Sequence, residues 1–435
     1  MRPRALSIDI ISFDTELMGK RVLVLLGLLL VAQCMLTSSY FKKKGIDVTD
    51  GVLQEEENLK KVYLSTVCND VDLSVPPYNH SGVVMSGYLN VNKAGSGLAF
   101  IFYGKEGAGR QDLKNYPTVI WLNGGPGSSS QMGNFMELGP HFVKPAPMAP
   151  YEIVKNNYTW IKEYNVIFVD QPVGTGLSFA DPDYKPDPYC KNMDDVAADF
   201  YYALKELYFN QNGCFNKLGF GGDHPLFVFG ESYAGKYAPA IGLKIKQEQV
   251  QNQGNITGLK GVAVGDGFTH PYFILTQVGE YAFNLGLIDY QERQMIEHLI
   301  LNGTYQERTR DMNELHNTFD SVLDLIVQMA GGVNVYDITS YKDYPTQILE
   351  SFFENPDIVS RFKLNSEVVY ASQSGQVYEG LFTDFMRQYV RLVEELLELK
   401  VNVMIYNGQN DLIVETPGTF KWVEQLHHDQ ADQFR

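Results

Sequence analysis

Short and almost continuously apolar runs alternate with segments of helical length along most of this chain. A strand that is apolar on both faces is covered on both faces, as in a parallel sheet packed between helices. The alternation predicts an α/β fold with a mostly parallel, doubly wound central sheet. The expected strands are Val83–Val91, Leu98–Tyr103, Thr118–Leu122, Asn165–Val169, Leu226–Phe229, Gly261–Val264 and Val401–Tyr406.

Helical spacing of apolar residues marks the segments between these strands. The first two strands, joined across Asn92–Gly97, are expected to form an antiparallel hairpin. From about Thr269 to Val368 helical patterns replace the alternation, which predicts a helical cap inserted over the carboxyl edge of the sheet. The expected helices are Met193–Phe209, Pro239–Gln253, Tyr281–Leu301, Asn313–Ala330 and Glu379–Lys400. The expected domains are the first part of the sheet domain at 40–268, the cap at 269–368 and the second part at 369–435.

The composition excludes several classes of protein. Hydrophobic residues make up 44% of the 435 positions, which is enough for a large core and excludes a disordered or collagen-like chain. The chain has 35 Lys and Arg against 52 Asp and Glu, a net charge of −17, and no basic runs, which argues against a nucleic-acid partner. The acidic residues between Asp181 and Asp187 lack the spacing of metal ligands, so we expect no metal and no cofactor.

An apolar stretch near the N-terminus indicates a secretory protein. Val22–Leu36 follows Lys20 and Arg21 and holds 15 residues, whereas a bilayer-spanning helix needs ~20 and a signal-peptide core ~7–15. We expect a cleaved signal peptide over residues 1–39, with 1–17 as an upstream extension, and no stable membrane span after cleavage. The polar sequence on both sides disfavours a buried core helix. The expected location is the secretory pathway, either lysosomal or extracellular.

Two further features bear on that route. Outside the expected signal peptide the three cysteines Cys68, Cys190 and Cys214 remain, and an odd number allows one disulfide and one free thiol. A Cys190–Cys214 bond would close a short loop, but the sequence leaves the pairing open. Four Asn-x-Ser/Thr triplets are predicted glycosylation sites, at Asn79, Asn157, Asn255 and Asn302.

The most informative tract is an apolar strand that runs into Gly-Glu-Ser-Tyr-Ala-Gly and then into a helix. This order is typical of a nucleophile elbow, a strained strand-to-helix turn that exposes a serine hydroxyl. Gly230 and Ala234 are small, as the turn requires on both sides of Ser232, although the strict pattern has glycine where Ala234 stands. A helix N-terminus also favours developing negative charge. The alternative is a serine that only caps the helix.

Two other tracts follow expected strands. The glycine-rich stretch Trp121–Ser130 lacks the patterns of a phosphate loop and of a dinucleotide site, but such a turn can direct backbone N–H groups at an oxyanion. The alternative is a plain connecting loop. The stretch Val401–Asp411 ends in a polar turn, and Asp411 follows Ser232 in the order Ser, Asp, His of α/β-hydrolases. Taken alone, an Asp after a strand is more often a turn residue.

Together these tracts resemble the serine carboxypeptidases, and more closely the vitellogenic carboxypeptidase-like branch of that family. The matching motifs extend from about Met85 to about Val414 and are jointly specific. They are Trp121–Gly127, Glu137–Pro140, Asn165–Gly176, Gly230–Tyr237 and Tyr406–Asp411. The resemblance implies the α/β-hydrolase fold with a helical cap, and an enzyme whose partners are the C-termini of peptides or proteins.

The resemblance also implies which residues perform the reaction. Ser232 would be the nucleophile, and Asp411 would be the acid that orients the base. The backbone N–H groups of Gly125 and Tyr233 would form the oxyanion hole.

A second group would bind the C-terminal carboxylate of the substrate. The residues at the matched positions are Asn123, Gly124, Glu137 and Glu231. Two Glu side chains beside a substrate carboxylate cannot all be ionised, so they must hold a proton between them. This arrangement restricts cleavage to chain ends and favours acidic pH.

The sequence departs from the family in its cysteines and its catalytic histidine. Ser128 stands where members often have Cys, and no cysteine follows Cys214 to pin the cap. The family's catalytic His lies in a Gly-His motif several dozen residues beyond Asp411, and the sequence after Asp411 holds only His427 and His428, without that motif. We interpret both as surface residues. The catalytic His, the last strand and the closing helix are therefore expected to be absent, which would make the sequence as written a truncated, inactive form.

Three functions remain open. The leading one is a serine-type carboxypeptidase that forms an acyl-enzyme on Ser232. The second is an acyltransferase or esterase on the same fold, which the nucleophile turn alone does not distinguish. The third is a non-catalytic peptide-binding or protective protein, which the missing His favours.

Overall fold

The computed structural model describes residues 66–93, 95–181, 183–185, 187–309, 311–429 and 431–434. The predicted signal peptide at 1–39 lies outside these residues, so it stays a prediction. No helix in the described part of the chain is both long enough and apolar enough to span a membrane.

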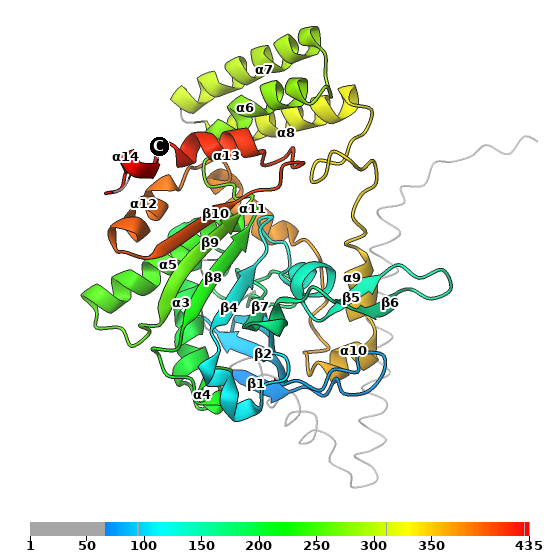
Figure 1. Cartoon of the computed structure of the whole chain (residues 1–435), viewed down its shortest axis with the longest axis vertical. Helices are drawn as coiled ribbons and strands as arrows, with labels where there is room; N and C mark the ends of the chain where they lie inside the picture. The colour runs from blue at the N-terminus through cyan, green and yellow to red at the C-terminus, as the bar shows by residue number, and fades with distance from the viewer. Residues whose placement is uncertain are drawn as a thin grey trace, which may run out of the picture. The chain divides into compact units, whose positions relative to one another are not determined.

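The central sheet has eight strands (Figure 1), which are β1 Val67–Asp70, β2 Val84–Asn90, β3 Gly97–Tyr103, β4 Thr118–Leu122, β7 Asn165–Val169, β8 Leu226–Glu231, β9 Leu259–Gly265 and β10 Asn402–Tyr406. Their order across the sheet is β1-β2-β3-β7-β4-β8-β9-β10. The five strands from β7 to β10 in this order run parallel, and β1, β2 and β3 add antiparallel pairs at one side. The seven predicted strands, the hairpin and the mostly parallel sheet are confirmed.

Apolar side chains cover both faces of the sheet. Phe100 and Phe102 of β3 belong to the core cluster on one face, and the alternate residues Ile101 and Tyr103 belong to the cluster on the other. The helices on the first face are α3 (Met193–Phe209), α5 (Ala234–Gln251) and α12 (Val390–Glu398) (Figure 1). The second cluster includes the π-helical turn η2 (Gly133–Leu138) and α9 (Ile348–Phe353).

Three long helices follow β9, in the region predicted as a cap. They are α6 (Pro271–Asn284), α7 (Tyr290–Thr309) and α8 (Met312–Met329), at the top of Figure 1. The prediction of one helix over Tyr281–Leu301 is wrong, because α6 ends before Gly286, whose φ of 70° is typical of a helix end. The division into a cap and a two-part sheet domain stays a prediction.

The predicted single helix Glu379–Lys400 is also wrong. The chain forms α11 (Gly375–Leu381), the 3₁₀ turn η4 (Phe382–Asp384) and then α12. The reason is tertiary, since the Lys236 side chain of α5 donates hydrogen bonds to the backbone carbonyls of Asp384 and Phe385. These carbonyls are directed at α5 and not along a helix axis.

Helix α5 begins at Ala234, before the predicted start at Pro239. A proline has no N–H to donate to the carbonyl four residues earlier, which here is the carbonyl of Gly235. The Thr269 Oγ1 hydroxyl donates to that carbonyl at 2.9 Å instead. The first turn of α5 is therefore satisfied in spite of the proline.

The other described elements are short. The strands β1, β5 and β6 were not predicted, because runs of four residues carry too little periodicity. These remaining elements are β5 His141–Lys144, β6 Glu152–Lys155, η1 Arg110–Asn115, η3 Trp160–Lys162, α4 Cys214–Leu218, α10 Pro356–Arg361, α13 Thr416–Val423 and α14 Ala431–Phe434.

The structure pairs Cys68 with Cys214 and leaves Cys190 as a buried free thiol. The short Cys190–Cys214 loop considered from the sequence is therefore wrong. The disulfide joins residues 146 positions apart in the sequence, with Cα atoms 5.4 Å apart, and it ties β1 to the start of α4. Sequence proximity did not predict the pair, because the sheet brings β1 next to α4.

We expect Cys68→Ala to lower the free energy of unfolding by about 2–4 kcal/mol, because closing a long loop restricts the unfolded chain. Urea unfolding under oxidising conditions measures this loss. Cys190→Ala is the matched control and is expected to cost less, since no covalent link is removed. A non-reduced peptide map that joins Cys190 to Cys214 would contradict the pairing.

Candidate active site

Ser232 lies in the turn between β8, which ends at Glu231, and α5. Its φ of 59° is in the left-handed region, which a residue with a side chain adopts only when its surroundings hold it there. The Ser232 N–H donates to the carbonyl of Gly265 at 3.0 Å, and the Ser232 carbonyl accepts from the N–H groups of Gly235 and Phe268 at 2.8 and 2.9 Å. The residue is partly exposed. The predicted strand, strained turn and helix are thus present around Ser232.

The glycine-rich loop after β4 passes directly over this turn. A Cβ atom added to Gly124 would lie 2.4 Å from the backbone nitrogen of Tyr233 and 2.7 Å from the carbonyl oxygen of Glu231. No side chain is possible there, so the close approach needs glycine. The loop therefore brings the backbone of Gly125 beside that of Tyr233, the two segments predicted to form the oxyanion hole. A Cβ atom at Gly230 would likewise lie 2.3 Å from the carbonyl oxygen of Ala234.

Three residues predicted to bind a carboxylate meet beside the turn. The Asn123 side-chain nitrogen donates to Glu231 Oε1 at 3.2 Å. Its oxygen accepts from the indole N–H of Trp121 at 2.9 Å and from the N–H of Gly133 at 3.1 Å, so the amide is held at both ends. The carboxyl group of Glu137, from η2, lies beside Glu231 and Asn123, whose side chains are close enough to affect its pKa.

The two glutamates perturb each other. Burial raises the pKa of Glu137. The pKa of Glu231 is raised well above its ordinary value, first by burial and then by the charge of Glu137. Two facing carboxyl groups are costly to ionise together, so the pair retains a proton at a pH where isolated carboxyl groups have lost theirs. A protonated carboxyl group can donate a hydrogen bond to an incoming carboxylate.

Asp411 follows β10, which is separated from β8 by β9 alone. Strands in a sheet lie ~4.8 Å apart, so the turns after β8 and β10 are about 10 Å apart at the same edge. The side chain of Asp411 is buried, and its Oδ1 accepts from the N–H of Val414 at 3.0 Å. Burial raises its pKa to about 8, and the charge of Asp266 contributes.

Sequence analysis did not single out Asp266, which directly follows β9 between the other two strands. Its N–H donates to the carbonyl of Tyr406 at 2.8 Å. Burial, and then the charge of Glu137, raises its pKa to about 6. The signal was the stretch Gly265-Asp266-Gly267 after an apolar strand, because polar residues at the carboxyl ends of parallel strands gather at one edge.

Tyr336 is a second residue that the sequence did not single out. The carbonyl of Val335 accepts from the N–H groups of Leu412 and Ile413, at 2.9 and 3.1 Å, so this segment lies against the turn that holds Asp411. The side chain of Tyr336 is 59% exposed. Its pKa is raised by partial burial of the phenol and then by the charges of Asp411 and Glu231. No motif marks Tyr336, because only the packing of two distant segments brings it there.

Five described histidines form ring hydrogen bonds, and none of these bonds goes to Asp411. Their partners are Thr118 for His224, Tyr378 for His316, the Tyr78 carbonyl for His141, the Phe273 N–H for His270, and Glu394 for His427. The side chain of His427 is 85% exposed, in agreement with its interpretation as a surface residue. His428 is partly exposed.

The four predicted glycosylation sites are all exposed in the structure. They lie before β2, before η3, before β9 and within α7, at Asn79, Asn157, Asn255 and Asn302. Exposure permits modification, and their glycosylation stays a prediction.

The family model of the serine carboxypeptidases matches residues 77–435. The chain belongs to this family. The resemblance predicted from the motifs is therefore confirmed, and so is the hydrolase class that the family defines.

Curated serine carboxypeptidases from animals and plants are similar over most of their length. The retinoid-inducible serine carboxypeptidase of Rattus norvegicus is 32% identical over 356 residues, which cover 74% of each chain. Serine carboxypeptidase 3 of Hordeum vulgare is 30% identical over 359 residues, which cover 80% of this chain and 67% of the relative.

A solved structure supports the fold of this serine carboxypeptidase. KEX1(DELTA)P, a prohormone-processing carboxypeptidase from Saccharomyces cerevisiae, superimposes with a TM-score of 0.68. The match covers 83% of this chain and 82% of that one at 21% identity. The predicted α/β-hydrolase fold is confirmed.

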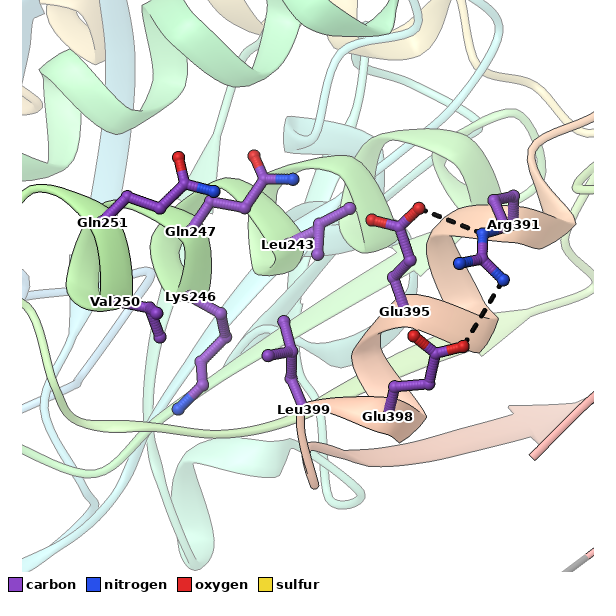
Figure 2. A pocket seen from close by; sticks show the side chains of 9 residues that line it. All are labelled: Leu243, Lys246, Gln247, Val250, Gln251, Arg391, Glu395, Glu398 and Leu399. Carbon is purple, nitrogen blue, oxygen red and sulfur yellow. Dashed lines mark hydrogen bonds and ion pairs between the residues drawn. The ribbon is translucent and has the colours of Figure 1, made fainter. Parts of the chain in front are cut away.

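One surface groove of this serine carboxypeptidase lies at the opposite end of α5 from Ser232. Figure 2 shows Leu243 and Val250 of α5 facing Leu399 across it. Arg391 of α12 pairs there with Glu395 of the same helix. The groove is formed by the outer surfaces of two helices and contains none of the residues predicted for catalysis.

Buried carboxyl groups and buried histidines change the free energy of unfolding in opposite directions as pH rises. Burial raises the pKa of Asp170 and Asp266 to about 6 and that of Asp411 to about 8, so these groups retain protons in the native state and disfavour folding as pH rises. Burial lowers the pKa of four histidines to about 4, so the unfolded chain binds more protons at these rings and folding is favoured as pH rises; they are His80, His224, His270 and His316. We expect the two effects to oppose each other up to about pH 7 and the free energy of unfolding to fall above it, where the histidines are neutral in both states and Asp411 still retains its proton. Urea unfolding at pH 4, 5, 6, 7 and 8 measures the slope.

A single substitution isolates the contribution of Asp411. We expect Asp411→Asn to raise the free energy of unfolding by about 1–2 kcal/mol at pH 7 and to change it little at pH 4, because asparagine removes the titration. Asp429→Asn is the matched control, since Asp429 is exposed and pairs with Lys400. Equal destabilisation by Asp411→Asn at both pH values would contradict the raised pKa.

Proposed function

We propose that this protein is a serine-type carboxypeptidase that releases C-terminal amino acids from peptides through an acyl-enzyme on Ser232. The observation that carries the proposal is the cluster of Asn123, Glu137 and Glu231 beside the Ser232 turn, in which Asn123 donates a hydrogen bond to Glu231. A shared proton between two carboxyl groups lets that cluster donate to the terminal carboxylate of a peptide. Gly124, which lies against the backbone of Glu231 and Tyr233, would donate its backbone N–H to the same carboxylate.

The reaction follows from where these groups lie. With the terminal carboxylate held, the last peptide bond lies over Ser232, whose Oγ attacks the carbonyl carbon. The oxygen becomes negatively charged and accepts hydrogen bonds from the N–H groups of Gly125 and Tyr233. The Ser232 proton passes through a base to the leaving amine, the terminal amino acid departs, and water then hydrolyses the ester. Asp411 would orient the base, for which we assign no residue.

The shared proton also supports a preference for acidic pH. As pH rises, the Glu137 and Glu231 pair loses its proton and repels the substrate carboxylate. Binding therefore weakens before the chemistry of Ser232 is affected.

An esterase or acyltransferase and a non-catalytic peptide-binding protein are the two alternative functions. An esterase or acyltransferase would use the same turn, but an ester substrate brings no free carboxylate for Glu137 and Glu231. A non-catalytic peptide-binding protein would keep the cluster without turnover.

We also propose that the protein enters the secretory pathway, to a lysosomal or extracellular location. The Cys68–Cys214 disulfide supports this, because disulfides persist in oxidising compartments. The exposure of the four sequons agrees with it.

Binding of an N-blocked dipeptide to the full chain tests the carboxylate cluster without requiring turnover. We expect Ser232→Ala to bind the dipeptide by calorimetry at pH 5 and to bind its C-terminal amide at least ~10-fold more weakly, since a charged hydrogen bond is worth about 1.5–3 kcal/mol. Equal affinity for acid and amide would contradict the proposed recognition.

The pH dependence tests the shared proton. We expect the dipeptide affinity to fall about 10-fold or more between pH 5 and 7.5, and to fall less in Glu231→Gln, whose amide keeps a donor at both pH values. Release of the C-terminal amino acid by the Ser232 protein, and none by Ser232→Ala, identifies the peptidase. Binding with no release by either would identify the peptide-binding candidate.

A further inference from the structure

A lysine with no exposed surface lies in the first turn of the helix that follows Ser232. Lys236 is 0% exposed, and its Nζ donates to the backbone carbonyl of Asp384 at 3.1 Å and also to that of Phe385. A buried ammonium group loses its hydration, so it is retained only where other groups compensate. The compensation here comes from a chain segment nearly 150 residues away, at η4.

Asp384 binds the same helix through its side chain. The carboxyl group is 1% exposed, and its Oδ2 accepts from the Tyr233 hydroxyl at 2.9 Å. Its Oδ1 accepts from the Tyr389 hydroxyl at 2.5 Å. Asp384 therefore accepts a hydrogen bond from Tyr233, the residue whose backbone N–H is proposed to stabilise the oxyanion. Lys236 donates a hydrogen bond to the backbone carbonyl of the same aspartate.

Further hydrogen bonds lead from Tyr389 through Thr269 back to α5, so the set of contacts is closed. The N–H of Tyr389 donates to the carbonyl of Thr269 at 2.9 Å. The hydroxyl of Thr269 in turn donates to the Gly235 carbonyl, which Pro239 leaves without its helical partner. The first turn of α5 is thus joined to the segment 384–389 at Tyr233, Lys236 and Gly235.

Aromatic side chains fill the space that these hydrogen bonds enclose between α5 and the segment 384–389. The Lys236 Nζ lies 4.4 Å from the centre of the Tyr233 ring, within the range of a cation–π contact. The Phe385 ring stacks on Tyr233 with ring centres 5.6 Å apart, and the His316 ring stacks on Phe385 with ring centres 4.0 Å apart. The turn after Ser232 therefore packs against buried side chains, and a displacement of the turn would disturb their contacts.

We propose that Lys236 and Asp384 are positioning residues that hold the backbone N–H of Tyr233 toward the developing oxyanion. The inference rests on the proposed role of Tyr233. The left-handed Ser232 turn needs surroundings that hold it in place, and the backbone hydrogen bonds of Ser232 go to Gly265 of β9, to Gly235 of α5 and to Phe268 in the loop after β9. A hydrogen-bond donor of an oxyanion hole is effective only when it is aimed in advance, and small displacements reduce its effect strongly.

The test compares a tetrahedral adduct with ordinary peptide binding. An N-acyl amino aldehyde adds to the Ser232 hydroxyl: the Oγ–C bond forms, the carbonyl π bond opens, and the hydroxyl proton moves to the new hemiacetal oxygen. That oxygen occupies the oxyanion hole at equilibrium, so the adduct reports on the Tyr233 N–H without requiring turnover. The N-blocked dipeptide acid reports on the carboxylate cluster.

We expect Asp384→Asn and Lys236→Met to weaken aldehyde binding by ~10–100-fold and to lower kcat by a similar factor, since removal of one oxyanion donor costs ~10²–10³-fold. The affinity for the dipeptide acid and KM are expected to stay within about twofold. Tyr389→Phe removes one hydroxyl at little risk to folding and is expected to give a smaller loss in the same direction.

The matched controls are Lys246→Met on the same helix and Tyr202→Phe on α3, which are expected to leave both affinities unchanged. Parallel loss of aldehyde and dipeptide affinity in the variants would reduce Lys236 and Asp384 to a general structural role and overturn the inference. Unchanged aldehyde affinity in folded Tyr389→Phe and Asp384→Asn would overturn it also. If the unsubstituted protein forms no aldehyde adduct, the proposed function fails first, and the inference fails with it.

Discussion

The left-handed turn at Ser232 is the constraint on which the rest of the site depends. A serine at a φ of 59° needs a backbone that doubles back, and this leaves no room for side chains at Gly230 and Gly124. Once both glycines are in place, the loop after β4 lies on the turn and its N–H groups meet those of α5. The neighbouring strand supplies the rest, because Gly265 at the end of β9 and Phe268 in the loop after it form hydrogen bonds with the backbone of Ser232.

Four acidic side chains lie close together at the carboxyl edge of the same sheet, and they cannot all be ionised at once. Glu137, Glu231, Asp266 and Asp411 come from four separate segments, and burial raises the pKa of each. Such an edge stabilises the protein least at neutral pH, since each retained proton disfavours folding as pH rises. The cost is consistent with a site that receives a carboxylate, because a protonated acid can donate a hydrogen bond where an ionised one repels.

Much of the fold was predictable because its signals are local. All seven predicted strands are present, since runs buried on both faces must be apolar throughout, although β10 at the edge of the sheet leaves Asn402 and Met404 exposed. Helix α3 occurs at its predicted bounds, because Asn192 caps it and its apolar spacing is regular. The errors have tertiary causes. The predicted helix Glu379–Lys400 breaks where Lys236 takes two of its carbonyls, and Cys214 pairs with Cys68 across the sheet and not with nearby Cys190.

The sequence by itself determined the family, the sheet and the residues of the Ser232 turn, because glycines, a serine and apolar runs at fixed spacing have few other solutions. It also marked Glu137, Glu231 and Asp411, through motifs that each stand beside a strand or a turn. Only the tertiary structure decided that Asp266 and Tyr336 join them, and that Lys236 and Asp384 lie buried behind Tyr233. Asp266 carries only the signal of a polar residue directly after an apolar strand. Tyr336, Lys236 and Asp384 carry no local signal, because their chemistry comes from neighbours that are distant in the chain and adjacent only after folding.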